Sequence, residues 1–229
     1  MTKQPQECSA NRVLADMVAA FEKEPKDTQS SSVVYDTDDD DGGPTTNPKV
    51  IQYRLWQWGV PLRFRSATLD DLPLAVRVEI RKWKDLPGTV LTLTGEVGTG
   101  KTYAAAAVLA ERARITSAPA SFVVVAELAA EMREAVSGGS TSQILKDLVQ
   151  VPLLVLDDFG AERVTDWVLE WMYLLINGRY NAMKPTVVTS NRSLGYIASN
   201  VDARLASRMA EGVALQLSGG DRRLQRGGA

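Results

Sequence analysis

The chain has 229 residues, of which 45% are hydrophobic and 24% are charged, and its formal net charge is −2. It contains one cysteine, Cys8, and no histidine, which excludes an intrachain disulfide, a Cys/His metal site and a catalytic histidine. No apolar run reaches the length of a membrane span and the N-terminus lacks the apolar core of a signal peptide, so we expect a cytoplasmic protein without membrane contact.

Charge divides the chain into two parts. Residues 1–48 hold ten acidic and four basic residues, a net charge of −6, whereas residues 49–229 carry a net charge of +4. We therefore predict a flexible acidic N-terminal region over 1–48 and one folded α/β domain over 49–229. The mildly basic domain is compatible with nucleic-acid contact but does not demonstrate it.

Within the N-terminal region, residues 11–24 have the spacing of a short amphipathic helix. Its apolar positions are Leu14, Met17, Val18 and Phe21. Such a helix can dock on a partner protein, pack on its own domain or fray, and the pattern leaves these alternatives open. The following linker, residues 25–48, has five aspartates between Asp36 and Asp41, which we interpret as a solvated tether rather than a metal site.

Two helices are predicted before the first strand, over Val50–Trp58 and Leu72–Lys82. The strand Thr89–Thr94 then leads to a glycine-rich loop, and an Ala/Leu-rich helix follows over Tyr103–Ala113. Strand, glycine loop and helix form the context that a phosphate-binding loop needs.

This loop fits the P-loop pattern G-x-x-x-x-G-K-[ST]. Its residues are Gly95, Glu96, Val97, Gly98, Thr99, Gly100, Lys101 and Thr102. Because the glycines carry no Cβ, the N–H groups of the loop can approach the phosphates of ATP. Lys101 would add positive charge for the β- and γ-phosphates, and the Thr102 hydroxyl is placed to hold Mg²⁺. The alternative, an ordinary glycine turn, is weakened by the flanking strand and helix.

A second strand is predicted over Ser121–Val125, followed by a helix over Ala126–Ala135 and a loop at 137–140. Thr141 or Ser142 is expected to cap the next helix.

A continuous apolar run, Val151–Asp158, predicts a strand that is buried on both faces and ends in two carboxylates. In a parallel sheet these carboxylates would emerge where ligands bind. This is the Walker B pattern: Asp157 would orient Mg²⁺, and Asp158 would orient or deprotonate the attacking water. The alternative is an Asp-Asp turn after a core strand.

The rest of the domain is predicted as two helix–strand pairs and a tail. The elements are the helix Val164–Tyr180, the strand Pro185–Asn191, the helix Ala203–Met209, the strand Val213–Leu217 and the basic tail 221–229. The first helix carries the large apolar side chains of Trp167, Leu169, Trp171, Leu174 and Leu175. Its aromatic positions are interpreted as core packing.

Three polar residues of this part are further site candidates. Asn191 could contact the γ-phosphate or the attacking water; the alternative is a turn, or a cap for a helix that starts near Ser193. Arg204 and Arg208 lie four positions apart on one helical face. They are candidates for an arginine finger that acts on the nucleotide of a neighbouring copy, and the alternative is a solvated basic face.

Taken in order, these motifs resemble those of the DnaC-type replicative helicase loaders, AAA+ ATPases related to the DnaA initiator and to the IstB transposition ATPases. The segments that carry the resemblance are Trp58–Phe64, Ala67–Leu69, Gly95–Thr102, Leu154–Glu162, Asn177–Tyr180, Lys184–Asn191 and Arg204–Arg208. The resemblance implies a P-loop AAA+ three-layer α/β sandwich whose five-stranded parallel sheet has the order 5-1-4-3-2. A C-terminal lid domain is not expected, because twelve residues follow Leu217.

The resemblance also implies roles for matching positions. The glycine loop would be Walker A and the two carboxylates Walker B. Val60 and Phe64 would line the adenine pocket, and Asn191 would be sensor 1. Arg208 would be the finger that acts in trans, with Arg204 as its basic companion.

The activity implied by the resemblance is ATP hydrolysis with Mg²⁺ in a homo-oligomer that forms in the ATP state. The partners would be a hexameric replicative DNA helicase and single-stranded DNA, with the helicase held by the N-terminal region. Hydrolysis is expected to be slow, because Asp158 is one methylene shorter than the glutamate found in many relatives.

Two other functions fit the same motifs. One is a regulator of transposition, similar to IstB, that binds duplex DNA as an ATP-bound filament. The other is a nucleotide-gated binding module with little turnover. A preference for duplex DNA would favour the regulator of transposition. Binding of ATP without hydrolysis would favour the binding module.

Overall fold

A computed structural model describes residues 42–83, 86–136, 141–160 and 166–220. The predicted helix over 11–24, the aspartate run, the loop at 137–140 and the tail at 221–229 lie outside the described residues. Within the described ranges, no helix combines the length and the apolar character needed to cross a bilayer.

Strands and helices alternate along the described chain. The strands are β1 (Val90–Thr94), β2 (Ala120–Val124), β3 (Leu153–Phe159), β4 (Thr186–Ser190) and β5 (Gly212–Gln216). The α-helices are α2 (Pro48–Gln57), α3 (Leu74–Trp83), α4 (Lys101–Ile115), α5 (Val125–Val136), α6 (Thr141–Gln150), α7 (Asp166–Asn181), α8 (Leu194–Asn200) and α9 (Ala203–Ala210). Two short 3-10 helices, η2 (Leu62–Phe64) and η3 (Leu69–Asp71), connect α2 to α3. These elements confirm the predicted succession, with boundaries that differ by a few residues.

The five strands form one parallel sheet in the order β2-β3-β4-β1-β5. This is the predicted order 5-1-4-3-2 read from the other edge. β1 lies between β4 and β5, with Val90 opposite both Thr186 and Gly212. The three central strands, β1, β3 and β4, have a neighbouring strand on each side and are almost entirely buried, whereas β2 and β5 form the edges of the sheet.

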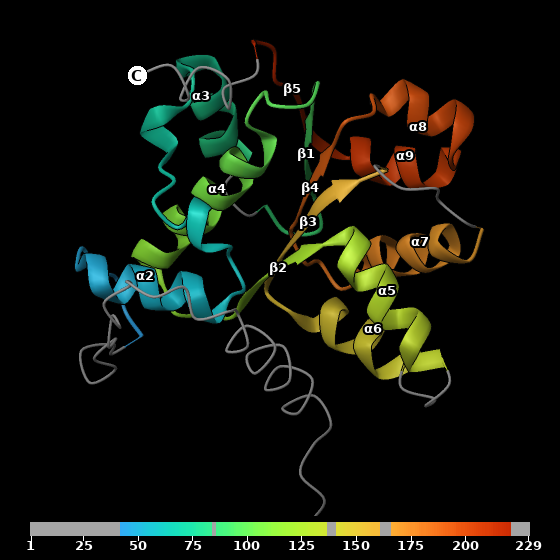
Figure 1. The fold of residues 1–229 in the computed structure, drawn as a ribbon, viewed down its shortest axis with the longest axis horizontal. Helices are drawn as coiled ribbons and strands as arrows, with labels where there is room; N and C mark the ends of the chain where they lie inside the picture. Colours follow the sequence, from blue (N-terminus) through green and yellow to red (C-terminus); the bar gives the residue numbers. More distant parts are fainter. Residues whose placement is uncertain (1–41, 84–85, 137–140, 161–165, 221–229) are drawn as a thin grey trace, which may run out of the picture.

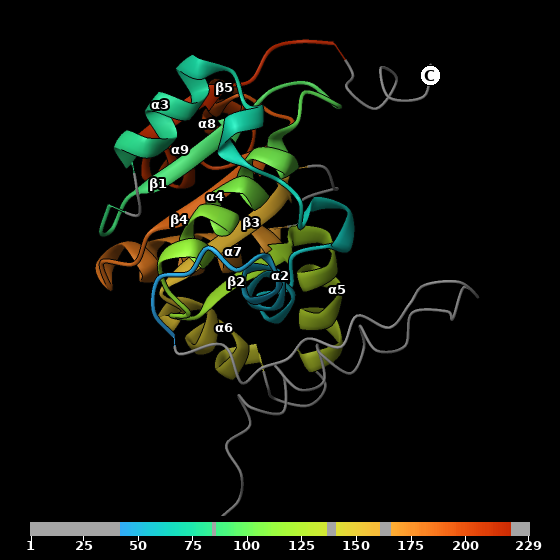
Figure 2. The same ribbon diagram turned by 90° about the vertical axis from the view of Figure 1, so that its left-hand side faces the viewer.

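Helices cover both faces of the sheet, as Figures 1 and 2 show. Successive side chains of a strand point to opposite faces, and β3 illustrates the consequence. Leu153 and Val155 belong to the core that α2, α3 and α4 cover, whereas Leu154 and Leu156 belong to the core under α5 to α9. The molecule is therefore a three-layer sandwich, as the P-loop AAA+ resemblance implied.

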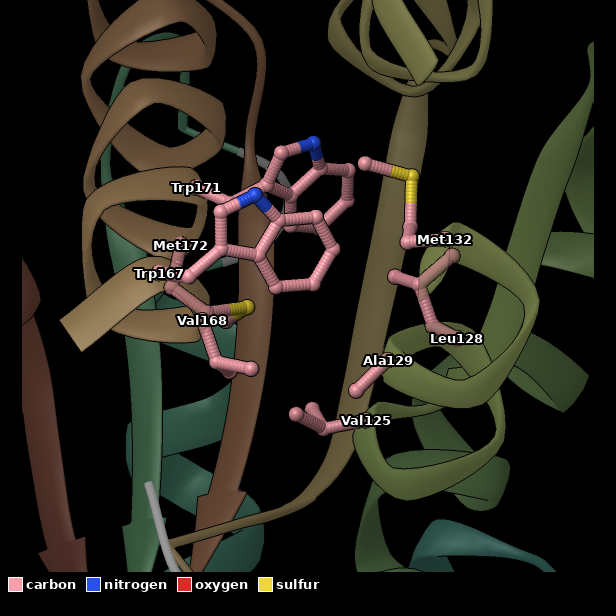
Figure 3. A pocket seen from close by; sticks show the side chains of 8 residues that line it. All are labelled: Val125, Leu128, Ala129, Met132, Trp167, Val168, Trp171 and Met172. Carbon is pink, nitrogen blue, oxygen red and sulfur yellow. The ribbon is translucent and has the colours of Figure 1, made fainter. Parts of the chain in front are cut away.

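The packing of α7 differs from the prediction. The helix buries Val168, Met172 and Leu175, whereas Trp167 is 36% exposed and Leu174 is 47% exposed. Core packing was therefore only partly right for the aromatic positions, because Trp171 packs against the core whereas Trp167 remains partly exposed. The indoles of Trp167 and Trp171 lie between α5 and α7, where they line a small apolar recess (Figure 3). Large apolar residues occur on more than one face of this helix, so spacing alone did not show which of them are buried.

The residues that cap the helices differ from those expected. Ser193, and not Asn191, caps α8 by accepting a hydrogen bond from the Tyr196 N–H (3.1 Å). The cap predicted for α6 was wrong, because α6 begins at Thr141, so Thr141 and Ser142 lie inside its first turn. Asp202 caps α9 by accepting from the Arg204 and Leu205 N–H groups.

Candidate nucleotide-binding site

The sheet order brings the polar ends of three strands together. β4 pairs with both β1 and β3, so the glycine loop after Thr94, the Asp157–Asp158 pair and Asn191 meet at the carboxyl edge of the central strands. Ligands of open parallel sheets bind at this edge. The structure therefore assembles most of the predicted site from segments that are nearly a hundred residues apart.

The glycine loop has a backbone that side chains would obstruct. Gly98 and Gly100 have φ values of +83° and +95°, in the left-handed region that favours glycine. Gly95 has φ +148°, and a Cβ there would lie 2.3 Å from the Leu217 carbonyl oxygen. The loop thus passes close to the chain that leaves β5, and its glycines are required by geometry as well as by the approach of a phosphate.

Lys101 is folded back over this loop. It is 7% exposed, and its Nζ donates to the carbonyl oxygens of Gly95 (2.9 Å) and Glu96 (2.7 Å). The Thr99 hydroxyl also donates to the Glu96 carbonyl (2.8 Å), which tightens the loop. The ammonium charge therefore lies at the centre of the loop, where phosphate oxygens would meet it.

Asp157 is held by two hydroxyl groups. The Thr102 Oγ1 donates to its Oδ2 (3.2 Å), and the Thr189 Oγ1 donates to its Oδ1 (2.6 Å). The residue is only 6% exposed, and this burial raises the pKa of the Asp157 carboxyl above its usual 3.8, an effect that the two hydroxyl groups oppose. The nearby charge of Asp158 adds to the rise, and Lys101 opposes it.

A β-bulge sets the direction of the second carboxylate. Leu156 and Phe159 are opposite Val188 and Ser190, so Asp157 and Asp158 together face the single residue Thr189. Asp158 has φ +61°, a left-handed conformation that aspartate adopts more readily than most residues. In a regular strand the two carboxylates would point to opposite faces. The bulge interrupts this alternation at Asp157 and Asp158.

Thr189 and Asn191 connect β4 to both carboxylates. The Thr189 Oγ1 accepts from the Asp158 N–H (2.9 Å) while it donates to Asp157. The Asn191 Nδ2 donates to the Asp158 Oδ1 (3.0 Å), which brings the predicted sensor residue to the predicted water-orienting acid. Sequence reasoning missed Thr189. Its only signal was a hydroxyl residue near the end of a strand that belongs to a predicted site.

The donor set fits Mg²⁺ with a nucleotide. A magnesium ion prefers oxygen ligands and is usually bound through one or two carboxylates together with substrate phosphates. The Thr102 hydroxyl and the Asp157 carboxylate are in direct contact, and Asp157 is a buried acid whose charged form a cation would stabilise. These two residues would hold the ion, and the glycine loop and Lys101 would hold the phosphates.

Replacing Asp157 with asparagine should stabilise the fold in the absence of nucleotide and Mg²⁺. Because folding raises the pKa of this acid, the folded state disfavours its charge at every pH above that pKa. The free energy of unfolding, measured with urea at neutral pH, should increase, and the gain should shrink as the pH falls through the raised pKa. Glu127→Gln, on the exposed surface of α5, is the control and should show no such gain.

The segment expected to form the adenine pocket lies against α4. Val60 is fully buried, while Phe64 is half-buried in η2 and packs on the core that contains α4. Two backbone contacts fix the segment: the Arg65 Nε donates to the Val60 carbonyl (2.8 Å), and the Phe122 N–H donates to the Trp58 carbonyl (2.7 Å). Of the two predicted residues, only Phe64 therefore has accessible surface, whereas Val60 belongs to the buried core.

The two arginines of α9 lie away from the loop of their own chain. Arg208 donates to Glu211 (2.9 Å) and Asn177 (3.3 Å), and its guanidinium lies 4.1 Å from the centre of the Tyr180 ring. α9 leads directly into the amino end of β5, whereas the glycine loop follows the carboxyl end of β1. The structure does not bring Arg208 to this cradle, so its predicted role requires a second copy of the chain.

Arg204 is the more exposed of the two. Its side chain is 68% exposed and pairs with Asp202 (2.9 Å), and its guanidinium lies 4.5 Å from the centre of the Tyr173 ring. The hydrogen bond and charge of Asp202 raise the pKa of Arg204, and the same contact lowers the pKa of Asp202. Both arginines are therefore held against α7 by aromatic rings, and neither is a simple solvated charge.

Comparison with known proteins identifies relatives of this domain. The family described as "IstB-like ATP binding protein" matches residues 87–215. The replicative helicase loader DnaC of Escherichia coli K12 is 27% identical over 124 residues, which cover 53% of this chain and 50% of that protein. The replicative helicase loader DnaI of Bacillus subtilis 168 is 33% identical over 107 residues, which cover 46% of this chain and 34% of that protein.

The fold has a corresponding match among solved structures. The crystal structure of the DnaC helicase loader superimposes with a TM-score of 0.57 at 28% identity, covering 69% of this chain and 98% of that chain. The chain spans at most about half the length of the curated relatives named above. The family match, over residues 87–215, includes all five strands apart from the last residue of β5, and it includes the glycine loop and the Asp157–Asp158 pair.

Proposed function

Because this chain belongs to the family of IstB-like ATP binding proteins, we propose that it is an ATP-dependent loader of a replicative DNA helicase. Subunits would bind ATP and Mg²⁺, assemble with a hexameric helicase and deliver it to single-stranded DNA. The observation that carries the proposal is the contact of Thr102 with Asp157 beside the glycine loop, because it unites the two halves of an ATP·Mg²⁺ site. The similarity to the DnaC and DnaI loaders supports the choice of partner.

Each residue of the site would have one role. Lys101 binds the β- and γ-phosphates, and Thr102 and Asp157 hold Mg²⁺, which neutralises phosphate charge when it is bound. Asp158 orients the attacking water, with Asn191 positioning its carboxylate through the 3.0 Å hydrogen bond. Because a short side chain in a left-handed bulge has little freedom to follow the substrate, turnover would be slow.

The two parts of the chain would have different roles. Residues 49–229 form the ATPase domain, and the acidic region over 1–48 contributes to helicase binding, with the 11–24 helix as its docking element. Copies of the chain would associate in the ATP state, since Arg208 lies away from its own cradle and its action requires a neighbour.

Replacing Arg208 with alanine should remove ATP hydrolysis while ATP affinity changes little. A finger stabilises charge that develops in the transition state, so kcat should fall about 10³-fold or more. Steady-state phosphate release and equilibrium binding of a fluorescent ATP analogue measure the two quantities. Arg192→Ala, on an exposed residue outside α9, is the control, and loss of affinity in the dilute Arg208→Ala monomer would contradict the finger role.

Co-purification with the replicative helicase of the same source tests the partner. The loader proposal predicts a complex that forms with the full chain and changes with ATP, and an oligomer that prefers single-stranded DNA. Absence of a complex both with and without ATP would overturn it.

The IstB-like description of the family favours a second candidate, an ATPase that regulates transposition. That function predicts preference for duplex DNA and stimulation of a transposase. A third candidate, a nucleotide-gated binding module, rests on the short Asp158 and predicts tight ATP binding without measurable turnover. Measuring both the dissociation constant for ATP and the rate of ATP hydrolysis separates this binding module from the two ATPase candidates.

A further inference from the structure

A groove of about 400 Å³ lies between α3 and α4, away from the candidate ATP site. It follows the second half of α4, from Val108 to Thr116, whereas the glycine loop precedes Lys101 at the start of that helix. Apolar side chains dominate its lining, among them Ile80, Trp83 and Ile115. A cavity of this size accommodates a few side chains rather than a whole helix.

The charged residues of the groove are mainly basic. Arg81 and Arg112 contribute two guanidinium groups to its lining, against one carboxylate from Glu111. Arg81 is half exposed, and its ion pair with the exposed Asp70 is long, at 3.6 Å. Exposed pairs of this kind contribute little stability, so an acidic ligand could compete with Asp70 for Arg81.

The N-terminal part of the chain arrives beside this groove. The Ser117 N–H donates to the Gly42 carbonyl (3.1 Å), and the Thr45 N–H donates to the Arg114 carbonyl (2.8 Å). Ser117 directly follows Thr116, which lines the groove. The chain that precedes Gly42 therefore starts within one or two residues of the end of the groove.

The sequence immediately before Gly42 has the chemistry that the groove would bind. Val33, Val34 and Tyr35 form an apolar triplet, and five aspartates follow between Asp36 and Asp41. We propose that residues 33–41 of the same chain occupy the α3–α4 groove, with the apolar triplet against its apolar lining and the aspartates near Arg81 and Arg112. This contact would tie the acidic region to the domain without involving the nucleotide site.

Residues 33–41 are long enough to extend along the whole groove. An extended segment of nine residues spans up to about 30 Å. The stretch of α4 from Val108 to Thr116 is roughly 12 Å long, so residues 33–41 can reach its far end from Gly42. The charges agree as well, because the region before residue 49 carries −6 and the rest of the chain carries +4. Attraction between them should weaken as salt rises.

Disulfide trapping in the full chain tests the proposal, because Cys8 is the only native cysteine. In a Cys8→Ser background, Tyr35→Cys is combined with Ile115→Cys inside the groove. The tether control pairs Tyr35→Cys with Arg114→Cys, one position away on the exposed side of the same turn. The exposure control uses Leu174→Cys on α7, since Leu174 and Ile115 are both 47% exposed.

The 35–115 disulfide should form about tenfold faster than the 35–114 disulfide, at a rate independent of protein concentration, and the 35–174 pair should not react appreciably. Changing Asp38, Asp39, Asp40 and Asp41 to asparagine should slow the 35–115 reaction severalfold, while Glu22→Gln with Glu24→Gln should not. Equal rates at 114 and 115 would overturn the proposal. So would a rate that rises with protein concentration, which would assign the groove to a second copy.

Discussion

ATP should bind far more weakly when Lys101 is replaced with alanine. Its ammonium group is the buried positive charge of the loop, and it also holds the loop together through the Gly95 and Glu96 carbonyl oxygens. Alanine removes both the charge that meets the phosphates and the two hydrogen bonds that shape the cradle. We expect the dissociation constant for ATP, measured by calorimetric titration, to rise about 100-fold or more.

Lys146→Ala is the matched control, because Lys146 is an exposed lysine on α6. Its affinity for ATP should equal that of the unchanged chain. If Lys101→Ala bound ATP as tightly as Lys146→Ala, the glycine loop would not be the ATP site.

The second large effect concerns stability. Arg179 is fully buried, and it donates to the Pro185 carbonyl (2.6 Å), the Leu148 carbonyl (2.6 Å), the Val151 carbonyl (2.8 Å) and the Thr186 hydroxyl (2.8 Å). One guanidinium thereby joins α7 to the end of α6 and to the start of β4. Burial lowers the pKa of Arg179 to about 9, so the group remains charged at neutral pH.

Arg179→Met should lower the free energy of unfolding by about 3–5 kcal/mol, because several carbonyl groups would stay buried without a donor. Urea denaturation followed by circular dichroism measures this loss. Arg192→Met replaces an exposed arginine that stacks on Tyr196 at 4.8 Å, and it should change stability by less than about 0.5 kcal/mol. Similar stabilities for the two variants would show that the buried guanidinium is not a structural clamp.

Local patterns were enough to predict most of the fold. The β-rich run before Gly95 became β1, and the continuous apolar run before Asp157 became β3, as expected for strands that are buried on both faces. The order of the strands depends on contacts between distant segments, and it was predicted through the resemblance rather than through any local pattern. The face that α7 buries was not predictable, since both of its faces carry large apolar residues.

Most residues of the candidate site were predicted, but the bulge and the hydrogen bonds that join them were not. The spacing of Lys101 and Thr102 reflects a local loop, which sequence describes well. The bulge at Asp158 and the bridging hydroxyl of Thr189 arise from the register between β3 and β4. Register is a tertiary property that neither strand encodes alone. The same holds for Arg179, whose partners lie at the end of α6 and at the start of β4.

We propose that one copy supplies the phosphate cradle and that a neighbouring copy supplies Arg208. ATPase activity in a mixture of Lys101→Ala and Arg208→Ala chains, each expected to be inactive alone, tests this arrangement. In a mixed assembly, an intact cradle from the Arg208→Ala chain can meet an intact arginine from the Lys101→Ala chain. We predict recovery of about a quarter of the unchanged activity when the two chains mix at random in a head-to-tail assembly. A mixture that stays as inactive as its two components would show that Arg208 does not complete the site of a neighbouring copy.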